Sequence, residues 1–359
     1  MKINYTGFLV DPSGYGEAAR RLICAAVETG CDVRLRNLLV DEGWKPSQAD
    51  MPEWLVNFLK SRPHEDPDVH VIHCPAQKFP DFAKGNGRQI GLFCWENDRL
   101  PQSVIDGCKA VSQLIVPSMF MQKLCKDAGL DASVIPYPMQ ASPTAPTFPD
   151  ARLLDKGQYK FYTITTWQPR KNPLDLLIAY LTEFTANEPV TLFMKVSGPN
   201  AGYAYKTALE ESKKLAMLLN VPSPPSVKMV GGQYLPDMIW GLHTSCDCFV
   251  SMTRGEAFGL PMLDAMSLGK PVIAPGFGGH ADFLDNYPGW RPVPFRMRPV
   301  LQKYEGFSGM QGWADPDVMA LRRLMREEFT VGKRTYEPDM FAHSSKWIGR
   351  QLKERLSGD

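Results

Sequence analysis

Residues 246–275, CDCFVSMTRGEAFGLPMLDAMSLGKPVIAP, contain the pattern that decides the fold. Residues 246–252 alternate small, apolar and β-prone side chains, as a buried strand does, and the tripeptide TRG at 253–255 ends that strand. Pro261 suits the first turn of a helix, because the N–H group that proline lacks would be unpaired there. Gly269 and the proline two residues later end the helix after about two turns. The segment therefore predicts a strand, an acidic loop, a short helix and a second strand.

The acidic loop predicts an anion site between two carboxylates. The backbone N–H groups of Phe258, Gly259 and Leu260 should point outward from the helix N-terminus, where partial positive charge favours a phosphate. Glu256 precedes this site, and Asp264 follows it with seven residues between the two acids. Carboxylates beside a phosphate site are good acceptors for sugar hydroxyls. Each acid alone has a plain alternative as a solvated or helix-dipole charge, but the ordered set favours a sugar-nucleotide site.

Residues 254–275 resemble the signature of glycosyltransferase family 4, whose retaining enzymes have the GT-B fold of two facing Rossmann-like domains. The resemblance implies that Glu256 contacts the hexose hydroxyls and that Asp264 contacts the ribose. Asp264 is one methylene shorter than the glutamate usual in the family. The donor-binding residues implied by the resemblance are Arg254, Ala257, Phe258, Gly259, Leu260, Asp264, Gly14 and Gly16.

The same resemblance gives the domain organisation of an α/β protein. A chain of 359 residues with 44% hydrophobic residues is long enough for two domains. We expect an acceptor-side Rossmann-like domain over 1–145, a nucleotide-sugar-binding domain over 155–335, and a helix over 336–359 that crosses back to the first domain. A linker is predicted over 139–156, where prolines, Ser, Thr and Ala gather without periodicity.

Two adjacent cations follow the first strand of the second domain. Arg170 and Lys171 lie between the predicted strand 159–166 and the next helix, where they can neutralise a diphosphate leaving group. In family 4 an arginine normally precedes the lysine by five residues, a position that Thr166 occupies here, so Arg170 is a substitute. Glu256, Lys171 and Arg170 are therefore the predicted catalytic residues, although a solvated cationic turn is the plain alternative for the two cations.

The N-terminal residues open a βαβ unit, with a strand at 2–10, a loop at 11–16 and a helix at 17–29. Gly14 and Gly16 resemble the glycine-rich loop that lies against the donor diphosphate and the acceptor in GT-B enzymes. They also fit the dinucleotide fingerprint G-x-G-x-x-A, which makes an NAD(P)-dependent oxidoreductase the rival interpretation. That signal is weak, because the second strand carries arginines where a dinucleotide enzyme has a ribose-binding acid.

Three residues of the first domain are acceptor-side candidates. His73 ends a predicted strand, where α/β sheets place site residues. Trp95 ends the predicted strand at 89–95 and Glu96 follows it; by the resemblance, both would line the cleft. Their plain alternatives are a structural histidine, a core tryptophan and a loop acid.

Charge and composition limit the classes of partner and the cellular compartment that we expect. The net charge of +1 gives no global case for nucleic-acid binding. Eight cysteines show no paired C-x-x-C spacing and read as reduced core thiols. The chain opens directly on a strand pattern and has no run of 18 apolar residues. We therefore expect a cytoplasmic protein, either free or peripheral at a membrane. We expect no transmembrane segment and no metal site.

Together with these features, the resemblance to family 4 implies a retaining, metal-independent hexosyltransferase of class EC 2.4. Its substrate would be a nucleotide sugar, with a UDP-sugar favoured over a GDP-sugar; no cofactor is implied and the acceptor is unidentified. A GT-B-fold sugar-nucleotide epimerase would act without an acceptor. An oxidoreductase would bind NAD(P) at Gly14 and Gly16, and a carbohydrate-binding module would release no nucleotide.

Overall fold

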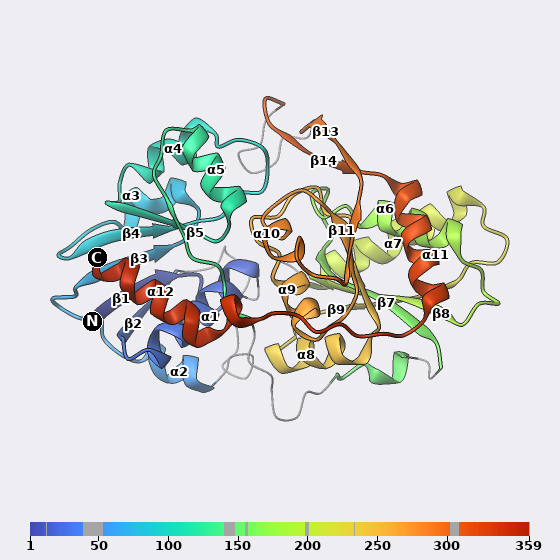
Figure 1. Cartoon of the computed structure of the whole chain (residues 1–359), viewed down its shortest axis with the longest axis horizontal. Helices are drawn as coiled ribbons and strands as arrows, with labels where there is room; N and C mark the ends of the chain where they lie inside the picture. The colour runs from blue at the N-terminus through green and yellow to red at the C-terminus, as the bar shows by residue number, and fades with distance from the viewer. Residues whose placement is uncertain are drawn as a thin grey trace.

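Two parallel six-stranded sheets form the framework of the computed structural model (Figure 1). The structure describes residues 1–11, 13–38, 53–139, 148–154, 157–197, 201–232, 234–301 and 309–358. The predicted linker at 139–156 lies partly outside these residues, at 140–147 and 155–156. The two sheets confirm the predicted α/β class with two Rossmann-like units.

The first sheet is built from the N-terminal part of the chain. Its strands are β1 (Lys2–Gly7), β2 (Asp32–Asn37), β3 (Val69–His73), β4 (Arg88–Leu92), β5 (Gln113–Val116) and β6 (Ser133–Val134). They pair in the order β2-β1-β3-β4-β5-β6. The helical segments between them are α1 (Gly14–Glu28), α2 (Glu53–Leu59), η2 (Ala76–Lys78), α3 (Phe79–Phe82), α4 (Gln102–Cys108) and α5 (Met119–Asp127).

The second sheet has the strand order of a dinucleotide-binding fold. Its strands are β7 (Tyr159–Thr166), β8 (Val190–Ser197), β9 (Ser226–Gly231), β10 (Cys248–Val250), β11 (Val272–Pro275) and β12 (Trp290–Val293). They pair in the order β12-β11-β10-β7-β8-β9. The segments η3 (Ala151–Leu153), α6 (Pro173–Glu183), α7 (Ala201–Leu219), α8 (Pro236–Ser245), α9 (Leu260–Ser267) and α10 (Ala281–Leu284) accompany them. The strand order reverses between β7 and β10, and open α/β sheets bind ligands at such a point.

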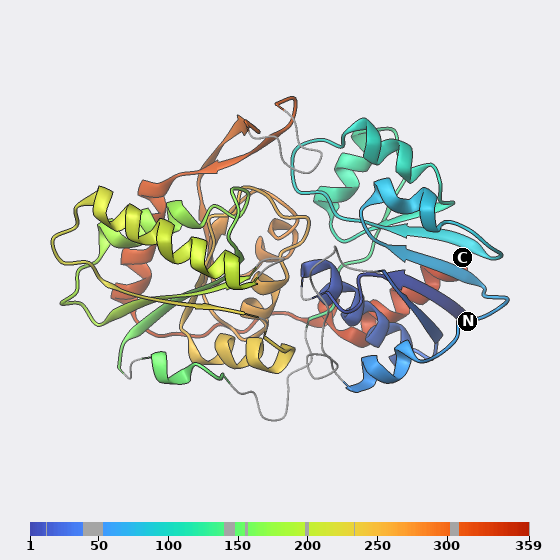
Figure 2. The same ribbon diagram turned by 180° about the vertical axis from the view of Figure 1, so that it is seen from behind.

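The chain ends on the first domain, as predicted. After the hairpin of β13 (Phe295–Pro299) and β14 (Gly312–Pro316) and the helix α11 (Val318–Val331), it returns through η4 (Phe341–His343) to α12 (Ser345–Ser357). Figures 1 and 2 show α12 beside α1, with both chain ends in the same lobe. Gly349 permits this close packing, since a Cβ atom there would lie 2.2 Å from the Ala25 carbonyl oxygen. The fold thus contains the expected crossover helix.

The start of α1 differs from the sequence prediction. Residues 11–16 were expected to form a loop, but α1 begins at Gly14, with Ser13 in an extended conformation before it. Gly16 lies in the first helical turn, where an added Cβ atom would be 1.9 Å from the Asp11 carbonyl oxygen. The helix can therefore begin early because glycine lets it pack onto the loop that precedes it.

No helix in the described parts of the chain is long and apolar enough to cross a membrane.

Candidate functional site

A cavity of about 370 Å³ lies between the two domains, at the point where the strand order of the second sheet reverses. The loop after β7 supplies Arg170 and Lys171 to its wall, and the loop after β10 supplies Glu256. The first domain contributes Tyr15 from α1 and Glu96 from the loop after β4. A cavity of this size is typical of small-molecule sites.

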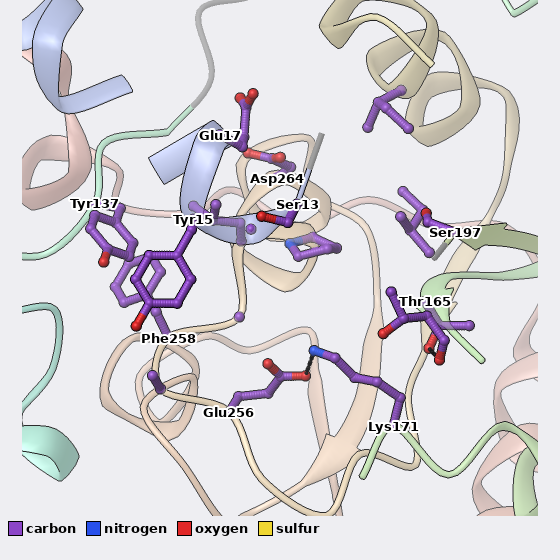
Figure 3. Close-up of a pocket in the computed structure, with 18 of the residues that line it drawn as sticks. Ser13, Tyr15, Glu17, Tyr137, Thr165, Lys171, Ser197, Glu256, Phe258 and Asp264 are labelled. Carbon is purple, nitrogen blue, oxygen red and sulfur yellow. Dashed lines mark hydrogen bonds and ion pairs between the residues drawn. The ribbon is translucent and has the colours of Figure 1, made fainter. Parts of the chain in front are cut away.

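Four charged side chains form one cluster in the cavity wall. Lys171 Nζ lies 2.5 Å from Glu256 Oε1, the contact drawn as a dashed line in Figure 3. Arg170 reaches both domains, because its guanidinium lies 3.7 Å from Glu256 Oε2 and 3.3 Å from Glu96 Oε1. Its Nη1 also donates to the Gly255 carbonyl at 2.7 Å. The cluster holds two cations and two anions, so each cation is held ready by an acid that an incoming anion can displace.

The charges of this cluster are strongly coupled. Burial alone would raise the pKa of Glu256, but Lys171 and Arg170 outweigh burial and lower that pKa. Burial lowers the pKa of Lys171, and the neighbouring Arg170 adds to the effect while Glu256 opposes it. Glu256 is therefore an ionised carboxylate at neutral pH, and Lys171 is a partly desolvated cation.

The loop before α9 has the geometry of an anion cradle. Gly259 precedes the helix with φ +97°, a conformation that favours glycine. Within the described residues, no backbone hydrogen bond is donated by Phe258, Gly259 or Leu260. The backbone N–H groups of these three residues lie at a helix N-terminus, and all three residues line the cavity. The arrangement can accept a phosphate.

The backbone of this loop is fixed from two sides. The Gly279 amide donates to the Glu256 carbonyl at 2.8 Å, and Ser118 Oγ of the first domain donates to the Ala257 carbonyl at 2.7 Å. His280 lies directly against Gly259. The loop is thus set before any ligand arrives.

Asp264 is engaged by an arginine of the opposite domain. Arg21 on α1 donates through Nη1 and Nη2 to the two Asp264 carboxylate oxygens, each at 2.7 Å. Arg21 also donates to Glu17 at 2.7 Å. The Arg21 and Asp264 side chains are only 7% and 3% exposed, so this ion pair is buried at the domain interface. It joins the two domains beside the cavity.

Aromatic side chains close one side of the cavity. Figure 3 shows Tyr15, Tyr137 and Phe258 together, opposite Thr165 and Ser197. The Tyr137 and Phe258 rings meet edge to face with centroids 5.0 Å apart. Tyr15 is anchored by the Cys94 amide, which donates to its hydroxyl at 3.0 Å. These residues offer apolar faces with polar edges to a ligand.

Four residues of the sequence prediction do not line the cavity. His73 is fully buried behind the aromatic wall, between the hydroxyls of Tyr5 and Tyr137 at 2.7 and 3.2 Å, and burial lowers its pKa to about 3. Trp95 is a core residue whose indole donates to the Arg99 carbonyl at 2.8 Å. The other two are Gly16, within α1, and Arg254.

Arg254 is largely buried by its own contacts, with 14% of its side chain exposed. It donates to the Pro169 carbonyl at 2.8 Å and lies 3.4 Å from Asp175 and 3.6 Å from Asp315. Its guanidinium also covers the Trp313 ring. These contacts support the loop that carries Arg170 and place no charge in the cavity.

Several lining residues were missed at the level of sequence. Arg21 had a readable signal, since it occupies the same helical face as the buried residues Ala18 and Leu22 and follows Glu17 by four. Lys195 and Ser197 end a strand whose other residues are all buried. Tyr137 had no signal, because its position depends on the packing of His73 and Phe258.

One family model matches part of the chain. Residues 145–290 match the family model of Glycosyl transferases group 1. No curated protein matches the chain.

Solved structures match nearly the whole fold. Sucrose-phosphate synthase from Thermosynechococcus elongatus is 16% identical with a TM-score of 0.64, over 100% of this chain and 94% of that chain. A trehalose-6-phosphate structure from E. coli bound with UDP-2-fluoro glucose is 10% identical with a TM-score of 0.63, over 100% and 99%. A glycosyltransferase from Rickettsia africae ESF-5 is 14% identical with a TM-score of 0.61, over 99% and 93%. These matches show the GT-B fold that residues 254–275 predicted.

Proposed function

We propose that the protein is a retaining, metal-independent glycosyltransferase that moves a hexose from a nucleoside-diphosphate sugar, with UDP favoured, to an acceptor bound against the first domain. The observation that carries the proposal is the cluster of Arg170, Lys171 and Glu256 beside the amides of 258–260. It brings two cations, a sugar-binding carboxylate and a phosphate cradle to one cavity. The match of residues 145–290 to group 1 glycosyl transferases supports the same activity.

The donor diphosphate is proposed to lie between the α9 N-terminus and Lys171. Bond cleavage at the anomeric carbon leaves negative charge on the β-phosphate, and two preorganised cations can stabilise it without a metal ion. The phosphate would take over Lys171 from Glu256, which frees the Glu256 carboxylate to accept hydrogen bonds from the hexose hydroxyls. The 2.5 Å ion pair between Lys171 and Glu256 is the contact that this exchange would break.

Asp264 is proposed to contact the ribose while Arg21 holds it. A carboxylate has about four lone-pair sites, and Arg21 uses two of them. The shorter side chain of aspartate is compensated by this fixed orientation.

The acceptor is proposed to enter beside Tyr15, Tyr137 and Glu96. Tyr15 and Tyr137 lie across the cavity from Thr165 and Ser197 (Figure 3). Aromatic faces with a nearby carboxylate suit a hydroxylated ring compound. The retaining outcome rests on the resemblance of residues 254–275 to family 4.

The first test is calorimetric titration with UDP, GDP, ADP and NAD, with and without EDTA. We expect tight, EDTA-insensitive binding of one nucleoside diphosphate. Glu256→Gln should keep the affinity for that nucleoside diphosphate within about threefold. It should slow the cleavage of the sugar nucleotide by on the order of 100-fold, because Glu256 contacts the reacting sugar and not the nucleotide.

Glu210→Gln is the matched control, since Glu210 is exposed on α7 outside the cavity. Binding of NAD alone would replace the proposal with an oxidoreductase. An equal loss of binding and turnover in Glu256→Gln would contradict the role given to that residue.

A further inference from the structure

Lys195 is a buried cation that the proposed chemistry does not use. It lies near the carboxyl end of β8, is 5% exposed, and lines the cavity. Its Nζ donates to Ser197 Oγ at 2.6 Å. Within the described parts of the chain, burial is the one influence that acts on its charge, and no carboxylate opposes it. An ammonium group has three donors and no acceptor, so donors remain for a ligand.

The surroundings of Lys195 are aromatic and apolar. Its ammonium lies 5.4 Å from the centroid of the Tyr234 ring. The Tyr234 hydroxyl donates to Asp150, which holds the ring in place. Ile164, paired with Lys195 across β7 and β8, also lines the cavity. Burial in this setting lowers the pKa of Lys195 to about 8, so the group is still charged at neutral pH.

This end of the cavity differs from the phosphate cradle. Ser197 lies on the side away from the aromatic wall of Tyr137 and Phe258, as Figure 3 shows. The cradle has Arg170, Lys171 and the amides of 258–260, whereas this end has one cation, a hydroxyl and a tyrosine ring. A flat ring with one acceptor at its edge fits such a site better than a polyanion does.

We propose that Lys195 reads the carbonyl oxygen at the outer edge of the donor nucleobase, O4 of uracil or O6 of guanine. This inference rests on the proposed function and adds its specificity. Cytosine and adenine carry an amino group at the same edge, which would point its own donors at the ammonium. Lys195 therefore selects uracil or guanine and rejects cytosine and adenine.

The test is calorimetry with the matched pairs UDP and CDP, and GDP and ADP, because each pair differs at that edge position. For the wild-type protein we expect the carbonyl-bearing member of the preferred pair to bind about 10- to 100-fold more tightly, the range for a hydrogen bond to a charged group. Lys195→Met should weaken the binding of that nucleotide and reduce the ratio of affinities within the pair to near one. Lys195→Gln keeps a neutral N–H donor and should retain part of the preference.

Lys228→Met is the matched control, since Lys228 lies on the adjacent strand β9 and does not line the cavity. Thermal unfolding of each variant checks that it is folded. A wild-type ratio near one would overturn the inference, as would tighter binding of CDP or ADP. An equal loss for all four nucleotides in Lys195→Met would assign the residue to phosphate instead. If the wild-type protein binds no nucleotide, the proposed function itself fails, and the inference fails with it.

Discussion

Lys195 and Lys171 show how the same residue type acquires two roles from its neighbours. Lys171 faces Glu256 at 2.5 Å, so its charge is compensated until a ligand exchanges with the carboxylate. Lys195 has a hydroxyl and an aromatic ring instead, so its charge carries an uncompensated desolvation cost. A cost of this kind is kept where a ligand repays it, as in a binding site.

The Lys195 cost predicts a pH dependence of stability. The folded pKa of about 8 lies below the ordinary value of 10.5, so the penalty is full below pH 8 and is relieved as pH rises toward 10.5. Lys195→Met should raise the free energy of unfolding at pH 7 by up to about 3 kcal/mol, since one pKa unit corresponds to about 1.4 kcal/mol. Denaturant unfolding at pH 7 and pH 10 checks this. A gain that stays constant, or grows, at pH 10 would contradict the assigned cause.

At the scale of elements, the short helix α9 depends on the turn that precedes it. Gly259 has φ +97°, and an added Cβ atom would lie 3.0 Å from His280 Cβ. The helix N-terminus can face the cavity only while this turn is kept. Its backbone geometry therefore links the Gly-Leu-Pro sequence to the phosphate cradle.

Gly259→Ala should lower the free energy of unfolding by about 1–2 kcal/mol from the left-handed backbone, plus the cost of moving His280. Gly129→Ala separates the two effects, because Gly129 has φ +74° and an added Cβ atom meets nothing within 4 Å. Only Gly259→Ala should also weaken nucleoside-diphosphate binding in calorimetry. Unchanged affinity in a folded Gly259→Ala protein would remove the cradle from the donor site.

At the scale of the whole molecule, the domains are joined beside the ligand cavity as well as through α12. The Arg21–Asp264 pair is one such joint, and the close approach of Gly255 to the Glu96 backbone is another. Because the site uses residues from both domains, its geometry depends on these joints. Arg21 is therefore a positioning residue for Asp264.

The two partners of this joint should respond unequally to substitution. Arg21→Met leaves Asp264 buried without its cation and should lower the free energy of unfolding by about 3–5 kcal/mol. Asp264→Asn should cost less, because Arg21 keeps Glu17 at 2.7 Å. In a double-mutant cycle the coupling should be about 0.5–3 kcal/mol, measured by calorimetric unfolding. Strict additivity would show that the pair does not join the domains.

The strands and helices were predicted from local pattern, whereas the two-domain arrangement and the crossover helix came from the resemblance of residues 254–275 to family 4. Strand runs such as VTLFMKVS, and turns at Gly259 and Gly269, set their own conformation. The same reasoning placed α1 three residues late. The start of α1 depends on the packing of Gly16 against Asp11, and no pattern in the neighbouring sequence predicts that packing contact.

The candidate site was harder to predict than the fold. The sequence predicted that Glu256, Asp264 and the backbone amides of 258–260 lie together, because one strand-loop-helix unit carries them all. It gave no means of separating Glu96, which lines the cavity, from Trp95, which is in the core. One residue along an irregular loop reverses the direction of a side chain, and only its packing partners fix that direction.

The sequence by itself determined which chemical groups the protein brings to its cavity: a glycine turn at a helix N-terminus, two carboxylates and a pair of cations. The turn and the two carboxylates lie within nine consecutive residues, so helix and loop geometry bring them together, whereas Lys171 meets Glu256 from 85 positions away. Only the tertiary structure decided that Asp264 is held by Arg21, that Arg254 faces away, and that Lys195 is a buried cation in the cavity. These facts depend on contacts between residues far apart in the chain, or on the cavity that the two domains enclose together.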